Sequence, residues 1–158
     1  MRHRDETSAG GIEIRRATLD DLQGMMKIER ASFPTPWPVA AIAADICENA
    51  FSRTLVAEDG DGVAGFIIYW VVEDERHLQN LAVDPSRRGR GIGRSMVEML
   101  VEEARRPPGA VVTLEVRESN DPARALYESF GFEVLGKRFG YYTDTKEDAL
   151  VMTLDLRR

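Results

Sequence analysis

The feature that most constrains the fold is the glycine- and arginine-rich run Arg87–Ser95, with the sequence RRGRGIGRS. An alternating apolar stretch precedes it and apolar residues at helical spacing follow it, so it joins a strand to an amphipathic helix. Glycines let backbone N–H groups approach a ligand closely, and a helix N-terminus offers unpaired donors and the positive end of a dipole. With arginines beside it, the run is suited to binding a pyrophosphate.

Two common phosphate motifs do not fit this run. A P-loop has lysine and then serine or threonine after its last glycine, whereas Arg94 stands in the lysine place and the spacing from Gly89 is one residue short. A dinucleotide fingerprint is G-x-G-x-x-G, whereas Gly89, Gly91 and Gly93 give G-x-G-x-G. Taken alone, the run could also be a basic turn that caps a helix.

The rest of the chain predicts an α/β protein with a mixed sheet and helices packed on it. Its 158 residues suit one domain, and we expect a loose tail over residues 1–11 and a single domain over 12–158. The expected order is β-α-α-β-β-β-α-β-α-β-β. The strands are expected at 12–14, 54–57, 63–72, 78–83, 111–116, 132–135 and 149–156, and the helices at 19–33, 39–47, 91–104 and 121–130.

Composition narrows the possible classes. Cys47 is the only cysteine, so no internal disulfide can form, which suits a reducing cytoplasm. The N-terminus has no apolar stretch typical of a signal peptide, and the longest apolar run, Val63–Val72, is about half the length that spans a bilayer. The histidines His3 and His77 make no metal-ligand spacing with Cys47, so no metal is expected. The net charge of −6 disfavours nucleic-acid binding.

The run also matches a family motif, because Arg88-x-x-Gly91-x-Gly93 fits the R/Q-x-x-G-x-G/A pattern of the GNAT (Gcn5-related) N-acetyltransferases. The resemblance extends from Ile12 to Leu156, and within the superfamily the chain looks like the RimI type. Enzymes of that type acetylate the N-terminal alanine of a small-subunit ribosomal protein. The segments that carry the likeness are Asn80–Pro85, Leu114–Asn120, Ala125–Phe132, and Tyr141-Tyr142 ahead of Glu147–Ala149.

The resemblance implies a GNAT fold with acetyl-CoA as the acyl donor, bound where a central strand splays. Backbone groups of the segment Leu81, Ala82 and Val83 would bind the pantetheine and polarise the thioester carbonyl. Asn120 would contact the pantetheine region. The pyrophosphate would lie on Arg88, Gly89, Arg90, Gly91, Ile92, Gly93, Arg94 and Ser95.

The resemblance also implies direct acetyl transfer in a ternary complex. Glu115 matches the general base of the family and Tyr127 matches its general acid. Trp37 and Tyr141 or Tyr142 fall where the peptide-binding loops of the family lie. The expected acceptor is a protein N-terminus, of a basic ribosomal protein, in the cytoplasm.

The residues alone leave a second interpretation of each catalytic candidate. Strand alternation places Glu115 on the face of Val111 and Thr113, where it could be an ion-pair partner of Arg117 or a base with a raised pKa. Tyr127 lies in the apolar stripe of its helix and could be a core residue.

Three other residues are equally open. Asn120 could cap a helix, and Trp37 could pack between the first two helices. His77, ahead of a strand, is more often structural than catalytic.

Other functions also remain open at this point. A GNAT enzyme could acetylate a lysine side chain, a polyamine or an antibiotic. A non-catalytic sensor of acyl-CoA is a second class, although binding alone requires neither Glu115 nor Tyr127. RNA binding would rest on the small patch of Arg87, Arg88, Arg90 and Arg94, which the net charge disfavours.

Overall fold

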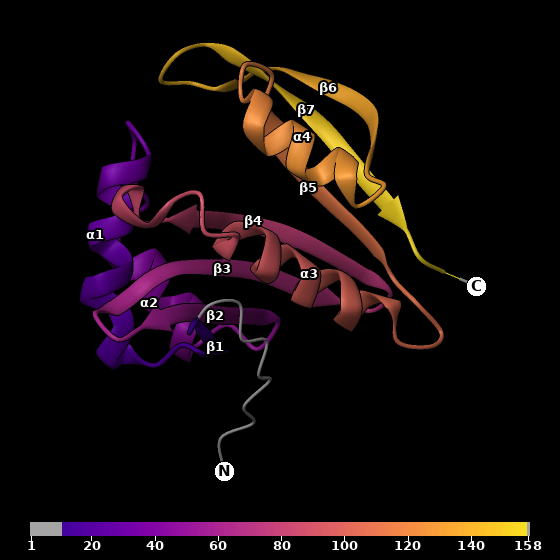
Figure 1. Cartoon of the computed structure of the whole chain (residues 1–158). Helices are drawn as coiled ribbons and strands as arrows, with labels where there is room; N and C mark the ends of the chain where they lie inside the picture. The colour runs from indigo at the N-terminus through magenta and orange to yellow at the C-terminus, as the bar shows by residue number, and fades with distance from the viewer. Residues whose placement is uncertain (1–10, 158) are drawn as a thin grey trace.

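The computed structural model describes residues 11–157, which form one seven-stranded sheet and its covering helices (Figure 1). The order along the sheet is β1-β2-β3-β4-β5-β7-β6, and the predicted order of strands and α-helices along the chain is confirmed. The expected tail falls almost wholly on residues 1–10, outside the described residues. The elements are β1 (Glu13–Arg16), α1 (Leu22–Ser32), α2 (Val39–Cys47), β2 (Ser52–Asp59), β3 (Gly62–Val72), β4 (Glu75–Val83), α3 (Ile92–Arg105), β5 (Val111–Arg117), α4 (Asp121–Ser129), β6 (Glu133–Tyr142) and β7 (Glu147–Asp155).

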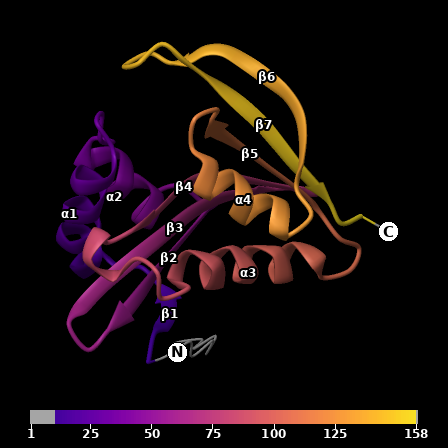
Figure 2. The same ribbon diagram turned by 45° about the horizontal axis from the view of Figure 1, so that its top comes forward.

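The helices form two layers, one on each face of the sheet. Helices α3 and α4 run beside each other on one face, and α1 and α2 lie on the other (Figure 2). Each layer has its own hydrophobic core. Met96 and Leu100 of α3 pack with Tyr127 of α4 in one core, whereas Met25 of α1 and Ile42 of α2 pack in the other. Within residues 11–157, no helix is long and apolar enough to cross a membrane.

The sheet opens between β4 and β5, the only two strands within residues 11–157 that pair in parallel. These strands pair over Glu75–His77 and Val111–Thr113 and then diverge. Beyond that point, in the part of the chain that the structure describes, β5 pairs only with β7, and β4 only with β3. The splay expected from the resemblance is therefore confirmed, and it separates β1–β4 from β5–β7 (Figure 1).

A bulge in β4 lies just past this opening. Tyr69 of β3 pairs with Leu78 and Ile68 pairs with Asn80, so Gln79 is an extra residue in β4. A bulge turns neighbouring side chains toward the same side of a strand. Both side chains face the α1 and α2 layer, because Asn80 bonds to Glu29 of α1 and Gln79 lies beside α2.

Some boundaries differ from the prediction. The first helix begins with a 3-10 turn, Leu19–Asp21, in which the Asp21 carboxylate accepts from the Thr18 N–H at 2.8 Å. Helix α4 is capped by Asn120, whose Oδ1 accepts from the Ala123 N–H at 3.2 Å, so the predicted cap at Asp121 is wrong by one residue. Strand β6 extends to Tyr142 because its far end still pairs with β7.

Candidate active site

The N-terminus of α3 builds the first part of the site. Its cap, Gly91, has a φ of 77°, a left-handed conformation that favours glycine. The Ser95 N–H makes the first bond of the helix, to the Gly91 carbonyl at 3.0 Å, so the N–H groups before it point out of the helix end. The Ser95 hydroxyl donates to the same carbonyl at 3.0 Å and stabilises this turn. The arrangement offers backbone donors to an anion.

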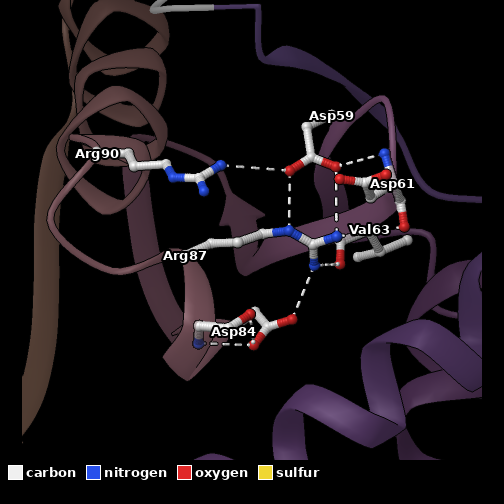
Figure 3. Close-up of polar contacts among 7 residues, drawn as sticks. Asp59, Asp61, Val63, Asp84, Arg87 and Arg90 are labelled. Atoms are coloured by element: carbon white, nitrogen blue, oxygen red, sulfur yellow. Dashed lines mark hydrogen bonds and ion pairs between the residues drawn. The ribbon is translucent and has the colours of Figure 1, made fainter.

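The arginines of the run divide into two groups. Arg87 is paired with Asp59 at 2.8 Å and with Asp84 at 2.7 Å, and it donates to the Val63 carbonyl (Figure 3). It therefore fastens the loop to the β2–β3 hairpin and is not available to a phosphate. Arg90 also reaches Asp59, at 3.7 Å.

Arg88 and Arg94 form the second group. Within residues 11–157, exposed Arg88 makes no ion pair, and exposed Arg94 lies 5.3 Å from the centre of the Phe130 ring. These two side chains remain to hold phosphate charge beside the helix end.

The splayed part of β4 supplies the next groups. The Asp84 N–H donates to the Ala64 carbonyl, so hydrogen bonds toward β3 fall on Asp84 and, by alternation, on Ala82. The N–H and C=O groups of Leu81 and Val83 therefore point to the side on which β5 has separated. Within the described residues no strand pairs with β4 there beyond His77, so these backbone groups remain available to a ligand.

Glu115 lies on the opposite face of the splay. Val112, Leu114 and Val116 of β5 face the α3 core, so Glu115 shares the other face with Val111 and Thr113, as predicted, and this face is turned toward the α1 and α2 side. Its Oε2 lies 2.6 Å from His77 Nε2, and its Oε1 lies 3.4 Å from Arg138 Nη2. The proposed ion pair with Arg117 is wrong, because Arg117 instead pairs with Asp144 at 2.9 Å.

The expected rise in the pKa of Glu115 is also wrong. Burial raises this pKa, but the hydrogen bond from His77 and the charges of His77 and Arg138 outweigh burial and lower it. The sequence gave no sign of these partners, since they come from β4 and β6.

His77 is a site residue that the sequence analysis did not assign. Gln79 Nε2 lies 2.9 Å from His77 Nδ1, while His77 Nε2 faces Glu115. The hydrogen bond to the Glu115 carboxylate requires a proton on His77 Nε2, and Nδ1 faces the Gln79 amide. Glu115, His77 and Gln79 thus form one chain of hydrogen bonds across the narrow end of the splay.

Tyr127 approaches from the other face, where it lies in the core with α3. It is 6% exposed, and its ring centre lies 5.7 Å from that of Phe132. Burial, with a smaller contribution from Tyr142, raises the pKa of Tyr127 well above its ordinary value. The pKa of Tyr142 is also raised, to about 12. Burial is the largest cause, and Tyr141 and Glu115 raise this pKa by smaller amounts. Tyr142 is thus within electrostatic range of both Glu115 and Tyr127.

A bridge joins the two sides of the splay on the Glu115 face. The Thr35 hydroxyl, in the α1–α2 loop, donates to Asp144 Oδ2 at 3.3 Å, and Asp144 pairs with Arg117 of β5. Arg117 also lies 4.0 Å above the ring of Tyr142. The β6–β7 hairpin, which holds Asp144, extends toward the α1 and α2 layer (Figure 2). Tyr142 ends β6, and Tyr141 lies in the same strand just before it, whereas both were expected in a loop.

A buried carboxylate holds the α1–α2 loop in place. Glu29 is 0% exposed, and it accepts from the Trp37 N–H at 2.9 Å and from Asn80 Nδ2 at 2.7 Å. The loop is therefore tied to β4 at its bulge. The sequence does carry a sign of this role, because Glu29 is the charged residue that interrupts the apolar stripe of α1. Trp37 both packs on the core of α1 and α2 and lines a cavity beside α2.

These features together define an N-acetyltransferase. A model of the Acetyltransferase (GNAT) family matches residues 22–132, and the chain belongs to this family. Its relatives include the ribosomal protein bS18-alanine N-acetyltransferase of Escherichia coli strain K12, which is 39% identical over 86% of this chain and 92% of that protein. N-alpha-acetyltransferase RimI of Mycobacterium tuberculosis is 34% identical over 91% of this chain and 92% of that protein.

Solved structures agree with this assignment. The ribosomal-protein-S18-alanine N-acetyltransferase from Escherichia coli superposes with a TM-score of 0.85 at 35% identity and covers 93% of this chain and 95% of that chain. Ard1 from Thermoplasma volcanium gives a TM-score of 0.84 at 26% identity and covers 94% of this chain and 99% of that chain. Among residues 11–157, no group of three or more His, Cys, Asp or Glu side chains could hold a metal ion.

Proposed function

We propose that this enzyme transfers acetyl from acetyl-CoA to the α-amine of a protein N-terminus, with the N-terminal alanine of a small-subunit ribosomal protein as its acceptor and the cytoplasm as its location. The name of the relative that is 39% identical over most of both chains supports this acceptor, and the name of the relative that is 34% identical supports an α-amine. The observation that carries the proposal is the bridge between Thr35 and Asp144.

The bridge favours a chain end over a side chain in mid-chain. It spans the acceptor side of the splay, from the α1–α2 loop to the β6–β7 hairpin, with Arg117 and Tyr142 below it. A polypeptide can insert its terminus beneath such a bridge. A lysine within a chain would need room for the backbone on both sides, which the bridge restricts.

The proposed chemistry divides between the two faces. Bound acetyl-CoA supplies an activated acetyl thioester. Glu115, on the acceptor face, removes a proton from the attacking amine, and Tyr127, on the cofactor face, donates a proton to the departing sulfur. Backbone groups of Leu81 and Val83 orient the donor, and Arg88, Arg94 and the α3 N-terminus hold its phosphates.

Proton chemistry also favours an α-amine. With a pKa of about 7.7–8.0, roughly a tenth of an α-amine is neutral at pH 7, whereas lysine, near 10.4, is neutral in only about one molecule in 2,500. The lowered pKa of Glu115 makes it a weak base. A weak base suits an amine that is already partly neutral better than it suits lysine.

The test uses two peptides that differ only in which amine is blocked. One begins with a free alanine and has blocked lysines, and the other has a blocked N-terminus and free lysines. We expect acetyl mass on the alanine peptide, formed at least a hundredfold more slowly when Glu115→Gln replaces the wild type, about the lower limit for the loss of a general base. Acetyl mass chiefly on lysine would reject the proposed acceptor and favour a lysine acetyltransferase. Coenzyme binding without transfer to any amine would favour a sensor.

A further inference from the structure

A cavity of about 480 Å³ lies beside the proposed acceptor site, between α2 and strands β3 and β4. Its walls include the indole rings of Trp37 and Trp70, the small side chains of Ala41 and Ala44, and Asp45. The catalytic arrangement proposed above uses none of the side chains of α2. Mostly apolar walls with one carboxylate are typical of a site that binds a side chain with a long stem and a polar end.

Asp45 has one oxygen free for a ligand. The residue is 8% exposed, and its Oδ1 accepts from Trp70 Nε1 at 2.9 Å and from Asn49 Nδ2 at 3.4 Å. Within residues 11–157, no group donates to Oδ2. Oδ2 is also not fully buried. In that range, the side-chain polar atoms that are fully buried and lack a hydrogen-bond partner are Ser32 Oγ and Arg124 Nε, and Oδ2 is not among them. Oδ2 therefore keeps some exposed surface, and Asp45 is one of the residues that line the cavity.

The cavity is close to the proposed base. Gln79 lines it and lies 2.9 Å from His77, which in turn lies 2.6 Å from Glu115. An extended peptide advances about 3.3 Å per residue. A peptide whose α-amine is at Glu115 can therefore place the side chain of its second, third or fourth residue in the cavity.

We propose that this cavity is a specificity subsite for a positively charged side chain, lysine or arginine, near the N-terminus of the acceptor, an inference that rests on the proposed function. Asp45 Oδ2 would accept a hydrogen bond from the cation, and the two indole rings would contact its charge and its methylene stem. A buried carboxylate with an unfilled oxygen disfavours an apolar side chain at the same place, because Oδ2 would lose contact with water and gain no donor.

The test measures peptides that carry one arginine. Each begins with alanine, has norleucine at positions 2 to 4, and carries arginine or its neutral isostere citrulline at one of these positions. Arginine is used because it stays charged and has no amine that accepts acetyl. At one position we expect arginine to lower KM about tenfold relative to citrulline, with the acetyl mass on the α-amine.

Protein variants then assign the preference to the cavity. Asp45→Asn keeps the acceptor for Trp70 and removes the charge. The ratio of KM for the citrulline peptide to KM for the arginine peptide should therefore fall to about twofold or less. Ala41→Leu places a larger side chain in the wall of the cavity and should have the same effect by obstructing it, which keeps the test decisive if the first variant is unstable. Glu102→Gln, an equal loss of charge on the exposed side of α3, should keep the wild-type ratio.

The outcomes separate this inference from the function on which it rests. If α-amine acetylation shows no preference for arginine, or if the preference survives in both cavity variants, the subsite is rejected and the proposed function stands. If no peptide gains α-acetyl mass, both are rejected.

Discussion

The two faces of the splay between β4 and β5 present different kinds of chemical group. The face of α3 and α4 offers backbone groups, glycines and a buried tyrosine, with Gly91 at the helix cap and Tyr127 in the core. The face of α1 and α2 is built from charged and polar side chains, in which Glu115 contacts both His77 and Arg138, and Asp144 contacts Thr35 of the α1–α2 loop. Backbone groups suit a donor molecule that never changes, whereas side chains can be altered to select an acceptor.

The largest effect is expected from Glu115, the centre of the acceptor face. Glu115→Gln keeps the shape of the side chain and removes the base, so kcat should fall about 10²–10⁴-fold. Affinity for acetyl-CoA, measured by calorimetry, should not change, because Glu115 points to the other face. Glu133→Gln, at the exposed start of β6, is the matched control. Wild-type turnover in Glu115→Gln would leave Glu115 only an ion-pair partner of His77 and Arg138.

The contrast between backbone groups on one face and side-chain contacts on the other also explains which parts of the site the sequence could predict. The loop predicted to bind pyrophosphate lies within nine consecutive residues, Arg87–Ser95, so a local pattern is enough to make that prediction. The order of strands and helices follows from local periodicity in the same way. Within this run, Arg87 pairs with Asp59 and Asp84, and it lies outside the residues Arg88–Ser95 that were predicted to hold the pyrophosphate.

The acceptor face depends on contacts between distant parts of the chain. Arg117 is two residues from Glu115 and on the same face, so a local argument pairs them. In the structure Arg117 finds Asp144, and Glu115 finds His77 of β4 and Arg138 of β6. Such pairs depend on the register of the sheet, which no spacing in the sequence reveals.

An intermediate effect is expected at Gly91 and would sharpen the description of the cofactor face. Asparagine and aspartate both tolerate the left-handed conformation that Gly91 adopts. They have nearly the same size, so the difference between Gly91→Asp and Gly91→Asn isolates the added negative charge. We expect Gly91→Asp to weaken acetyl-CoA binding about a hundredfold and Gly91→Asn clearly less, because only aspartate repels a pyrophosphate.

The readout for Gly91 is calorimetry at low salt, with melting temperatures to verify folding. Gly60→Ala is the control, since a Cβ at Gly60 meets no atom within 4 Å. Equal affinities for the two Gly91 variants would mean that no phosphate charge lies near the α3 N-terminus, and the backbone description of this face would fail.

The smallest effect is expected in the pH profile of kcat/KM. The two faces shift the pKa values of their catalytic candidates in opposite directions. His77 and Arg138 hold the pKa of Glu115 below its ordinary value, so the base is ionised throughout the range in which the protein is tested. Burial holds the pKa of Tyr127 well above its ordinary value, so the acid stays protonated far into the alkaline range. Both groups are therefore in their working forms across neutral pH, and only the acceptor amine changes its state.

Because an α-amine has a pKa of about 7.7–8.0, kcat/KM should rise tenfold per pH unit below about pH 7.5 and then stay level to about pH 9.5. Tyr127→Phe should lower the level part without changing its shape. A fall in the wild-type profile between about pH 8 and 9.5 that disappears in Tyr127→Phe would show that Tyr127 ionises in this range, contrary to its burial in the core.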